Sequence, residues 1–246
     1  MNEEPQDDGA SKGDDFYVGY LPVPWGHSRF LRVAVPVALW VFASVAGVLA
    51  FSQRDPGEAV WDTSVVREWT GIVRTDPVPF LETDDGPLLI VQVGKIGAQE
   101  RVSAHADRPA IVRGWSLTRG DRRMIELEPG ETAIEPTGPV IEKAATRELA
   151  ETVSISGEIV DSKCFLGAMK PGNGKGHKAC AILCIRGGIP AVVVGTDDAG
   201  RTTWAVVYAG SPILPEAWLD RVAEPVELAG RLESVGGLPV LRLDPG

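Results

Sequence analysis

Hydrophobic residues follow two different patterns along this chain, and the first is one unbroken apolar run near the N-terminus. Residues 33–51 read VAVPVALWVFASVAGVLAF and contain no charged residue. The hydrocarbon core of a bilayer, about 30 Å thick, needs about 20 apolar residues at the rise of an α-helix. The run therefore predicts a transmembrane helix over residues 33–52, with Pro36 in its first turn, where a missing N–H costs little.

The residues before this run indicate how it is placed in a membrane. Residues 1–15 are polar and acidic and are predicted to form a disordered tail. Residues 16–32 are rich in aromatic residues, which is typical of an interfacial belt and also suits a segment that docks on a membrane protein. Arg29 and Arg32 precede the run, which favours a bacterial inner-membrane anchor with a cytoplasmic N-terminus and periplasmic C-terminal domains. A cleaved signal peptide is the alternative.

After the apolar run, hydrophobic residues alternate with polar ones in short stretches, which predicts β-strands. Two regions carry the same succession of stretches. Residues 110–130 end the first region with a strand, a glycine, a turn and a closing strand, and residues 226–246 end the second region in the same way. This internal repeat predicts two domains, residues 60–135 and 150–246, joined by a linker around residues 135–147.

The predicted fold class is mostly β, with two tandem small barrels after the transmembrane helix. About five strands per unit favour an OB-like barrel, and an SH3-like barrel or a β-sandwich is the alternative. The second domain carries an insertion, residues 164–190, with a short helix over residues 177–185, and a further helix is expected over residues 211–222. Large aromatic residues dominate small cores, so five tryptophans are expected to cap the barrels. These are Trp61, Trp69, Trp115, Trp204 and Trp218.

The composition narrows the choice of partners. The chain has 246 residues, a formal net charge of −10 and an isoelectric point near 4.9. Its basic residues form no cluster, whereas nucleic-acid-binding surfaces are usually basic. Nucleic acid is therefore not an expected partner, even for an OB-like barrel. The expected partners are the lipid bilayer and a membrane protein.

Candidate chemistry is concentrated in the insertion, which contains all three cysteines of the chain. On the predicted helix, His177, Cys180 and Cys184 fall at positions i, i+3 and i+7 and share one face. Cys164 can meet that face from the end of the preceding strand. Thiolate and imidazole ligands suit zinc, copper, an iron–sulfur cluster or haem, so these four residues are predicted to bind a metal or cofactor. The spacing contains no C-x-x-C or C-x-x-C-H motif.

The cysteines have two other uses that the sequence leaves open. In an oxidising compartment, Cys164 would pair with Cys180 or Cys184 in a disulfide. A reactive thiol is the other use, because Lys163 next to Cys164 could lower its pKa. Against catalysis, no third member of a Cys–His arrangement is evident, and Asp161 and Lys163 are expected to be a solvated surface pair.

The insertion also carries a recognisable string. Gly157 to Pro190, with its D-S-K-C…G-K-x-H-x-x-C-A-x-x-C-I-x-G-G-I-P motif, resembles uncharacterised membrane-anchored bacterial proteins. The resemblance implies no particular activity. In architecture alone, an anchor before an exported OB barrel is similar to the haem chaperones of cytochrome c maturation, although their single-domain layout and haem-attaching histidine motif are absent here.

These patterns predict a membrane-anchored periplasmic accessory or binding protein of a membrane redox system. The Cys/His cluster would hold its metal or cofactor. A structural or assembly subunit with one disulfide and a thiol–disulfide oxidoreductase are the alternatives. Binding is expected rather than catalysis.

Overall fold

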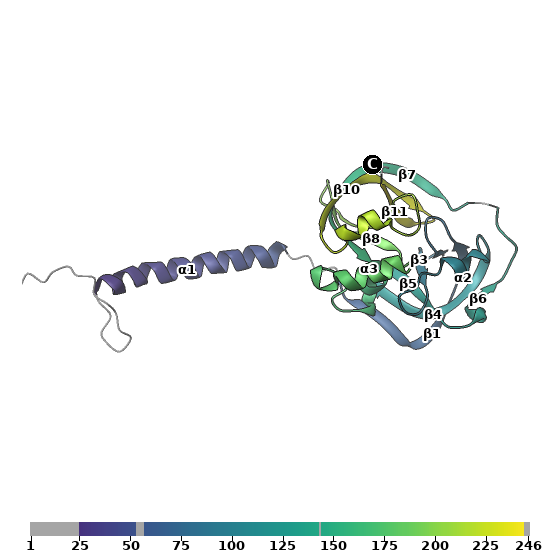
Figure 1. Cartoon of the computed structure of the whole chain (residues 1–246), viewed down its shortest axis with the longest axis horizontal. Helices are drawn as coiled ribbons and strands as arrows, with labels where there is room; N and C mark the ends of the chain where they lie inside the picture. The colour runs from purple at the N-terminus through teal and green to yellow at the C-terminus, as the bar shows by residue number, and fades with distance from the viewer. Residues whose placement is uncertain (1–24, 53–56, 143, 244–246) are drawn as a thin grey trace, which may run out of the picture. The chain divides into compact units, whose positions relative to one another are not determined.

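The structure is a computed structural model that describes residues 25–52, 57–142 and 144–243. The chain divides into two units, Met1–Asp55 and Pro56–Gly246. Figure 1 shows a single long helix in the first unit and a second unit rich in strands.

The first unit contains helix α1 (Trp25–Ser52), whose 28 residues span about 42 Å at the rise of an α-helix. Its segment Trp25–Ala50 contains an 18-residue window with a mean hydropathy of 2.3 and is long and apolar enough to cross a membrane. An apolar N-terminal helix is therefore confirmed. The predicted disordered tail, residues 1–15, and the first part of the aromatic segment lie outside the described residues.

Helix α1 begins earlier than the apolar run predicts. It starts at Trp25, so Pro36 lies inside the helix and not in its first turn. Residues 25–32 contain no proline that would stop the helix, and the guanidinium of Arg29 lies 5.5 Å from the centre of the Trp25 ring. This cation–π contact joins two side chains one helical turn apart.

The second unit is built mainly from strands. Its elements in chain order are β1 (Ala59–Arg74), β2 (Phe80–Glu82), β3 (Leu88–Val91), α2 (Gln99–Ser103), β4 (Pro109–Arg119), β5 (Arg122–Leu127), η1 (Glu131–Ala133), β6 (Ile134–Pro136), β7 (Arg147–Asp161), η2 (Cys164–Ala168), η3 (Lys175–His177), α3 (Lys178–Arg186), β8 (Ala191–Asp197), β9 (Thr202–Tyr208), η4 (Glu216–Arg221), β10 (Pro225–Val235) and β11 (Leu238–Leu243).

These strands close into two five-stranded barrels. In the first barrel the order is β1–β2–β3–β5–β4, and β4 pairs with β1 to close it. In the second barrel the order is β7–β8–β9–β11–β10, and β10 pairs with β7. The third and fifth strands of each barrel are parallel. The predicted mostly β class with two small barrels is confirmed, and the exact domain boundaries stay a prediction.

Two glycines explain why the two regions end alike. Gly114 in β4 and Gly230 in β10 lie at matching places, each paired with the last strand of its barrel. A Cβ atom at Gly114 would lie 2.2 Å from the carbonyl oxygen of Glu126, and one at Gly230 would lie 2.4 Å from that of Arg242. Only glycine permits so close an approach of two backbones, so the repeat in sequence reflects a repeated backbone geometry.

Buried side chains of both barrels share one hydrophobic cluster. It combines Phe80 and Leu117 of the first barrel with Phe165 and Val240 of the second. Two further clusters each belong to one barrel. Because the shared cluster removes apolar surface of both barrels from water, the barrels pack as one compact unit within Pro56–Gly246.

The segment between β7 and β8 contains η2, η3 and α3. Helix α3 lies one residue later than the predicted helix over residues 177–185 and ends before two glycines. Gly188 has a φ of 91°, which favours glycine and stops the helix. The helix predicted over residues 211–222 is the shorter 3-10 helix η4.

The same segment lies against the first barrel. The N–H of Gly97 donates to the carbonyl oxygen of Gly187 at 2.7 Å. A Cβ atom at Gly187 would lie 1.8 Å from the carbonyl oxygen of Lys95. This backbone contact sets the position of α3 relative to the first barrel.

Candidate functional site

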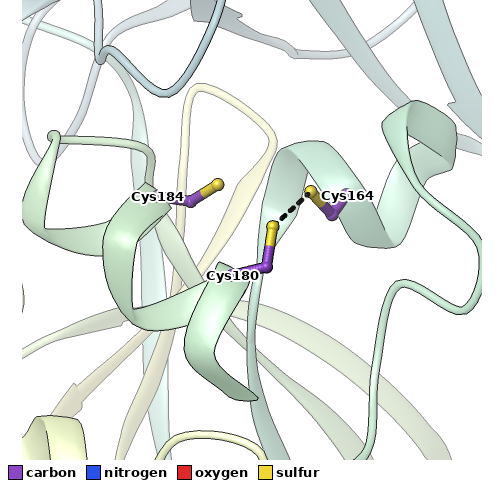
Figure 2. Close-up of side chains that lie close together, drawn as sticks. All are labelled: Cys164, Cys180 and Cys184. Carbon is purple, nitrogen blue, oxygen red and sulfur yellow. Dashed lines mark hydrogen bonds between the residues drawn. The ribbon is translucent and has the colours of Figure 1, made fainter. Parts of the chain in front are cut away.

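The segment between β7 and β8 brings the three cysteines together. Cys164 begins η2, and Cys180 and Cys184 lie one turn apart on α3. The three sulfur atoms lie within 4.8 Å of one another. Figure 2 shows the Sγ atoms of Cys164 and Cys180 pointing toward each other, 4.0 Å apart. Cys164 and Cys184 are buried and Cys180 is partly exposed, so the cluster could hold a metal ion at the edge of the core.

All three cysteines are free thiols in this structure. The sulfur–sulfur separation of 4.0 Å between Cys164 and Cys180 is about twice the length of a disulfide bond. The three thiols are not bonded to one another here, and the disulfide stays a prediction.

His177 lies on another side of Cys164. Its Nε2 is 2.9 Å from Oδ2 of Asp161, and both side chains are buried. The other carboxylate oxygen of Asp161 accepts the backbone N–H of Cys164 at 2.8 Å. Ligand atoms of Asp161, Cys164 and His177 lie within 4.8 Å of one another, but His177 does not join Cys180 and Cys184 in one such group. The reason is that His177 precedes α3 as its N-cap residue, instead of lying on its cysteine face.

The sequence interpretation missed Asp161 as a site residue. It found no third member of a Cys–His arrangement, whereas the structure places Asp161 on His177. The expected solvated surface pair is also wrong, because Asp161 and Lys163 are 0% and 3% exposed. The end of β7 is buried because Val160 packs in the shared cluster and Asp161 contacts His177.

Two lysines connect the barrels beside the cysteines. Nζ of Lys163 donates to the carbonyl oxygens of Gln92 and Gly94 and to Oε1 of Glu126, at 2.9, 2.6 and 2.6 Å. From the first barrel, Nζ of Lys95 lies 2.7 Å from Sγ of Cys180. Because Lys95 is 85 residues before Cys180, no local pattern in the sequence connects the two.

These contacts shift the pKa values of the Cys164 and Cys184 thiols in opposite directions. The hydrogen bond from the Cys164 thiol, together with the ammonium of Lys95, holds the pKa of Cys184 below its usual value. The same hydrogen bond and burial raise the pKa of Cys164. The hydrogen bond to Cys180 raises the pKa of Lys95. The first proton therefore leaves the Cys164–Cys184 pair readily and the second leaves it with difficulty.

A cavity of about 390 Å³ opens beside the cysteines, between the two barrels. Trp61, Trp115 and Met169 are among the residues that form its mostly apolar wall. Trp61 is 41% exposed, so the expectation that it caps a barrel core is wrong. Trp204, in contrast, is buried in the shared cluster, as expected.

No protein-family model, curated protein or solved structure matches this chain. Fold and site together define a protein with an apolar N-terminal helix, two fused five-stranded barrels and a Cys/His cluster that could bind a metal ion.

Proposed function

We propose that this protein is a membrane-anchored accessory protein of a membrane redox system, and that it binds a soft metal ion through Cys164, Cys180 and Cys184. The main support for the proposal is that the three sulfur atoms lie within 4.8 Å of one another. Thiolates bound to one metal at about 2.3 Å are about 3.8 to 4 Å apart. The 4.0 Å between Cys164 and Cys180 fits this separation.

The donor set favours zinc or monovalent copper. Both prefer thiolate sulfur, and three cysteines leave one coordination position open toward the cavity. An iron–sulfur cluster usually takes four protein ligands, and the chain has only three cysteines. The ammonium of Lys95, at the exposed edge of the site, offsets part of the negative charge of the thiolates.

His177 is proposed to support the site instead of binding the metal directly. Its imidazole is held by Asp161, and Asp161 in turn holds the backbone of Cys164. Outer-shell contacts of this kind orient metal ligands. The prediction of His177 as the fourth ligand remains the alternative, because its ring lies within 4.8 Å of Cys164.

We also propose that both barrels are OB-like and that they lie on the periplasmic side. The order of the strands, the parallel third and fifth strands and a short helix between the third and fourth strands support the OB-like class. Arg29 and Arg32 before the apolar residues support a cytoplasmic N-terminus. A metal site carried by a membrane anchor supports a membrane protein as the partner.

The test is the metal content of the full chain, purified in detergent without a metal-binding tag from cells supplied with zinc and copper. We expect stoichiometric metal by elemental analysis. Cys180→Ser and Cys184→Ser should each weaken metal binding at least about tenfold, since loss of even an outer-shell partner costs that much.

Ala181→Ser is the matched control, because Ala181 is buried on the same helix but packs in a cluster of the second barrel. It should keep the full metal content. A wild-type chain without metal, or a Cys180→Ser chain that retains as much as Ala181→Ser, would contradict the proposal.

A thiol–disulfide oxidoreductase is the second candidate, favoured by the 4.0 Å between the sulfur atoms of Cys164 and Cys180. In that reaction Cys164 and Cys180 would form a disulfide with each other, and their two electrons and two protons would convert a substrate disulfide into two thiols. Metal-free protein that reduces a model disulfide, with loss of activity in Cys164→Ser, would favour this function over metal binding.

A further inference from the structure

One carboxylate oxygen beside the cysteine cavity has no partner. Glu126 in β5 is 1% exposed and lines the cavity. Its Oε1 accepts a hydrogen bond from Lys163, but its Oε2 has no hydrogen-bond partner among the described residues. A buried oxygen without a donor is destabilising and calls for an explanation.

Lys163 cannot supply the missing donor. An ammonium group has three N–H donors, and Lys163 directs them to Gln92, Gly94 and Oε1 of Glu126. The other ammonium at the cavity, that of Lys95, contacts the sulfur atoms of Cys180 and Cys184 at 2.7 and 3.7 Å. Neither ammonium group therefore donates to Oε2 of Glu126, and a molecule in the cavity that Glu126 lines could supply the donor.

The walls of the cavity restrict which molecule can bind there. A volume of about 390 Å³ lies in the size range of small-molecule sites. Two indole side chains, Trp61 and Trp115, and the thioether of Met169 offer surfaces on which an aromatic ring packs well. An apolar wall with one buried acceptor matches a small ring that carries one O–H or N–H group.

We propose that the cavity binds a small, uncharged aromatic molecule whose hydroxyl or amine group donates to Oε2 of Glu126. Trp61, Trp115 and Met169 contact the ring, and the ion pair with Lys163 holds the carboxylate in place. The ligand then lies next to Cys164, Cys180 and Cys184. This site does not depend on the proposed metal, because its recognition elements are the carboxylate and the apolar wall.

The experiment uses the full chain in detergent, treated with a chelator and kept reduced. Two fluorinated probes of nearly equal size are compared by fluorine NMR line broadening: para-fluorophenol, which has an O–H donor, and para-fluoroanisole, in which a methyl group replaces the proton. Wild-type protein should bind the anisole about tenfold more weakly, since the anisole leaves Oε2 unpaired. In Glu126→Gln, whose amide keeps an acceptor for Lys163 but presents N–H groups in place of Oε2, this preference should disappear.

Trp115→Leu provides a second variant, and it should weaken both probes alike because it removes part of the apolar wall. The two probes partition into detergent to different extents, so the broadening of each probe is corrected with protein-free detergent before probes and variants are compared. Equal binding of the two probes to wild-type protein, or no binding of either, would overturn the proposal. If Glu126→Gln does not fold, the wild-type comparison of the probes decides alone. If the probes do not bind as expected but the protein contains metal before chelator treatment, the proposed ligand is wrong and the proposed metal function still stands.

Discussion

The two barrels have the same strand order but differ in what connects their first two strands. In the first barrel a short turn joins Arg74 to Phe80, whereas in the second barrel the chain between Asp161 and Ala191 forms η2, η3 and α3. All three cysteines and His177 lie in that longer connection. The repeated parts of the two barrels thus supply the scaffold, and the part that is not repeated supplies the chemistry.

The comparison also shows that neither barrel builds the site alone. Lys163 of the second barrel enters the first and is held by Glu126, while Lys95 of the first barrel reaches the cysteines of the second. The two ammonium groups differ in environment, because Lys163 is buried among oxygen acceptors and Lys95 contacts sulfur near the surface. They should therefore have different roles, Lys163 in stability and Lys95 in the ionisation of the thiols.

The largest effect is expected from Lys163→Met. The substitution leaves the carboxylate of Glu126 buried without its counter-ion, which typically costs about 3–5 kcal/mol. Thermal unfolding followed by near-ultraviolet circular dichroism should show a large decrease in the melting temperature. Lys175→Met is the control, since the Lys175 side chain is 77% exposed and pairs at the surface with Glu224. Equal melting temperatures for the two variants would mean that the buried pair does not join the barrels.

A smaller effect is expected from Gly187→Ala, which tests the backbone contact between the barrels. The new Cβ atom would lie 1.8 Å from the carbonyl oxygen of Lys95, so α3 must move, with a loss of about 2 kcal/mol or more. Gly176→Ala is the matched control, because a Cβ atom there has nothing within 4 Å. Urea unfolding should separate the two variants. A neutral Gly187→Ala would show that α3 is free to shift without loss of stability.

The repeat and the strands could be predicted because their signals are local. Alternating residues mark each strand, and Gly114 and Gly230 mark matching places where two backbones come close. The apolar run predicts the start of α1 too late, because the charged residues Arg29 and Arg32 interrupt the apolar pattern. Long arginine side chains can extend toward the membrane surface, so they do not end a helix there.

The cysteine cluster could be predicted because its signal is also local: Cys180 and Cys184 are one helical turn apart. The place of His177 could not, because it depends on the backbone at the first turn of α3 and on a buried carboxylate at the end of β7. Lys95 and Glu126 come from the other barrel. Lys95 and Glu126 reach the cysteines only because the two barrels pack together, and the sequence pattern of one barrel does not predict that packing.

The smallest effect is expected from Lys95→Met, and it concerns ionisation instead of stability. The hydrogen bond from Cys164 is the main cause that lowers the pKa of Cys184, and the positive charge of Lys95 favours the thiolate form further. Without that charge the pKa of Cys184 should rise, so the thiolate should form at higher pH than in wild-type protein. The ultraviolet absorbance of thiolate, measured against pH in reduced, metal-free protein, reports this shift directly. Lys178→Met removes the same charge from α3, where Lys178 pairs with Glu224, and should leave the titration unchanged. If Lys95→Met also leaves the thiolate titration unchanged, the first barrel lines the cavity but does not affect the ionisation of the thiols.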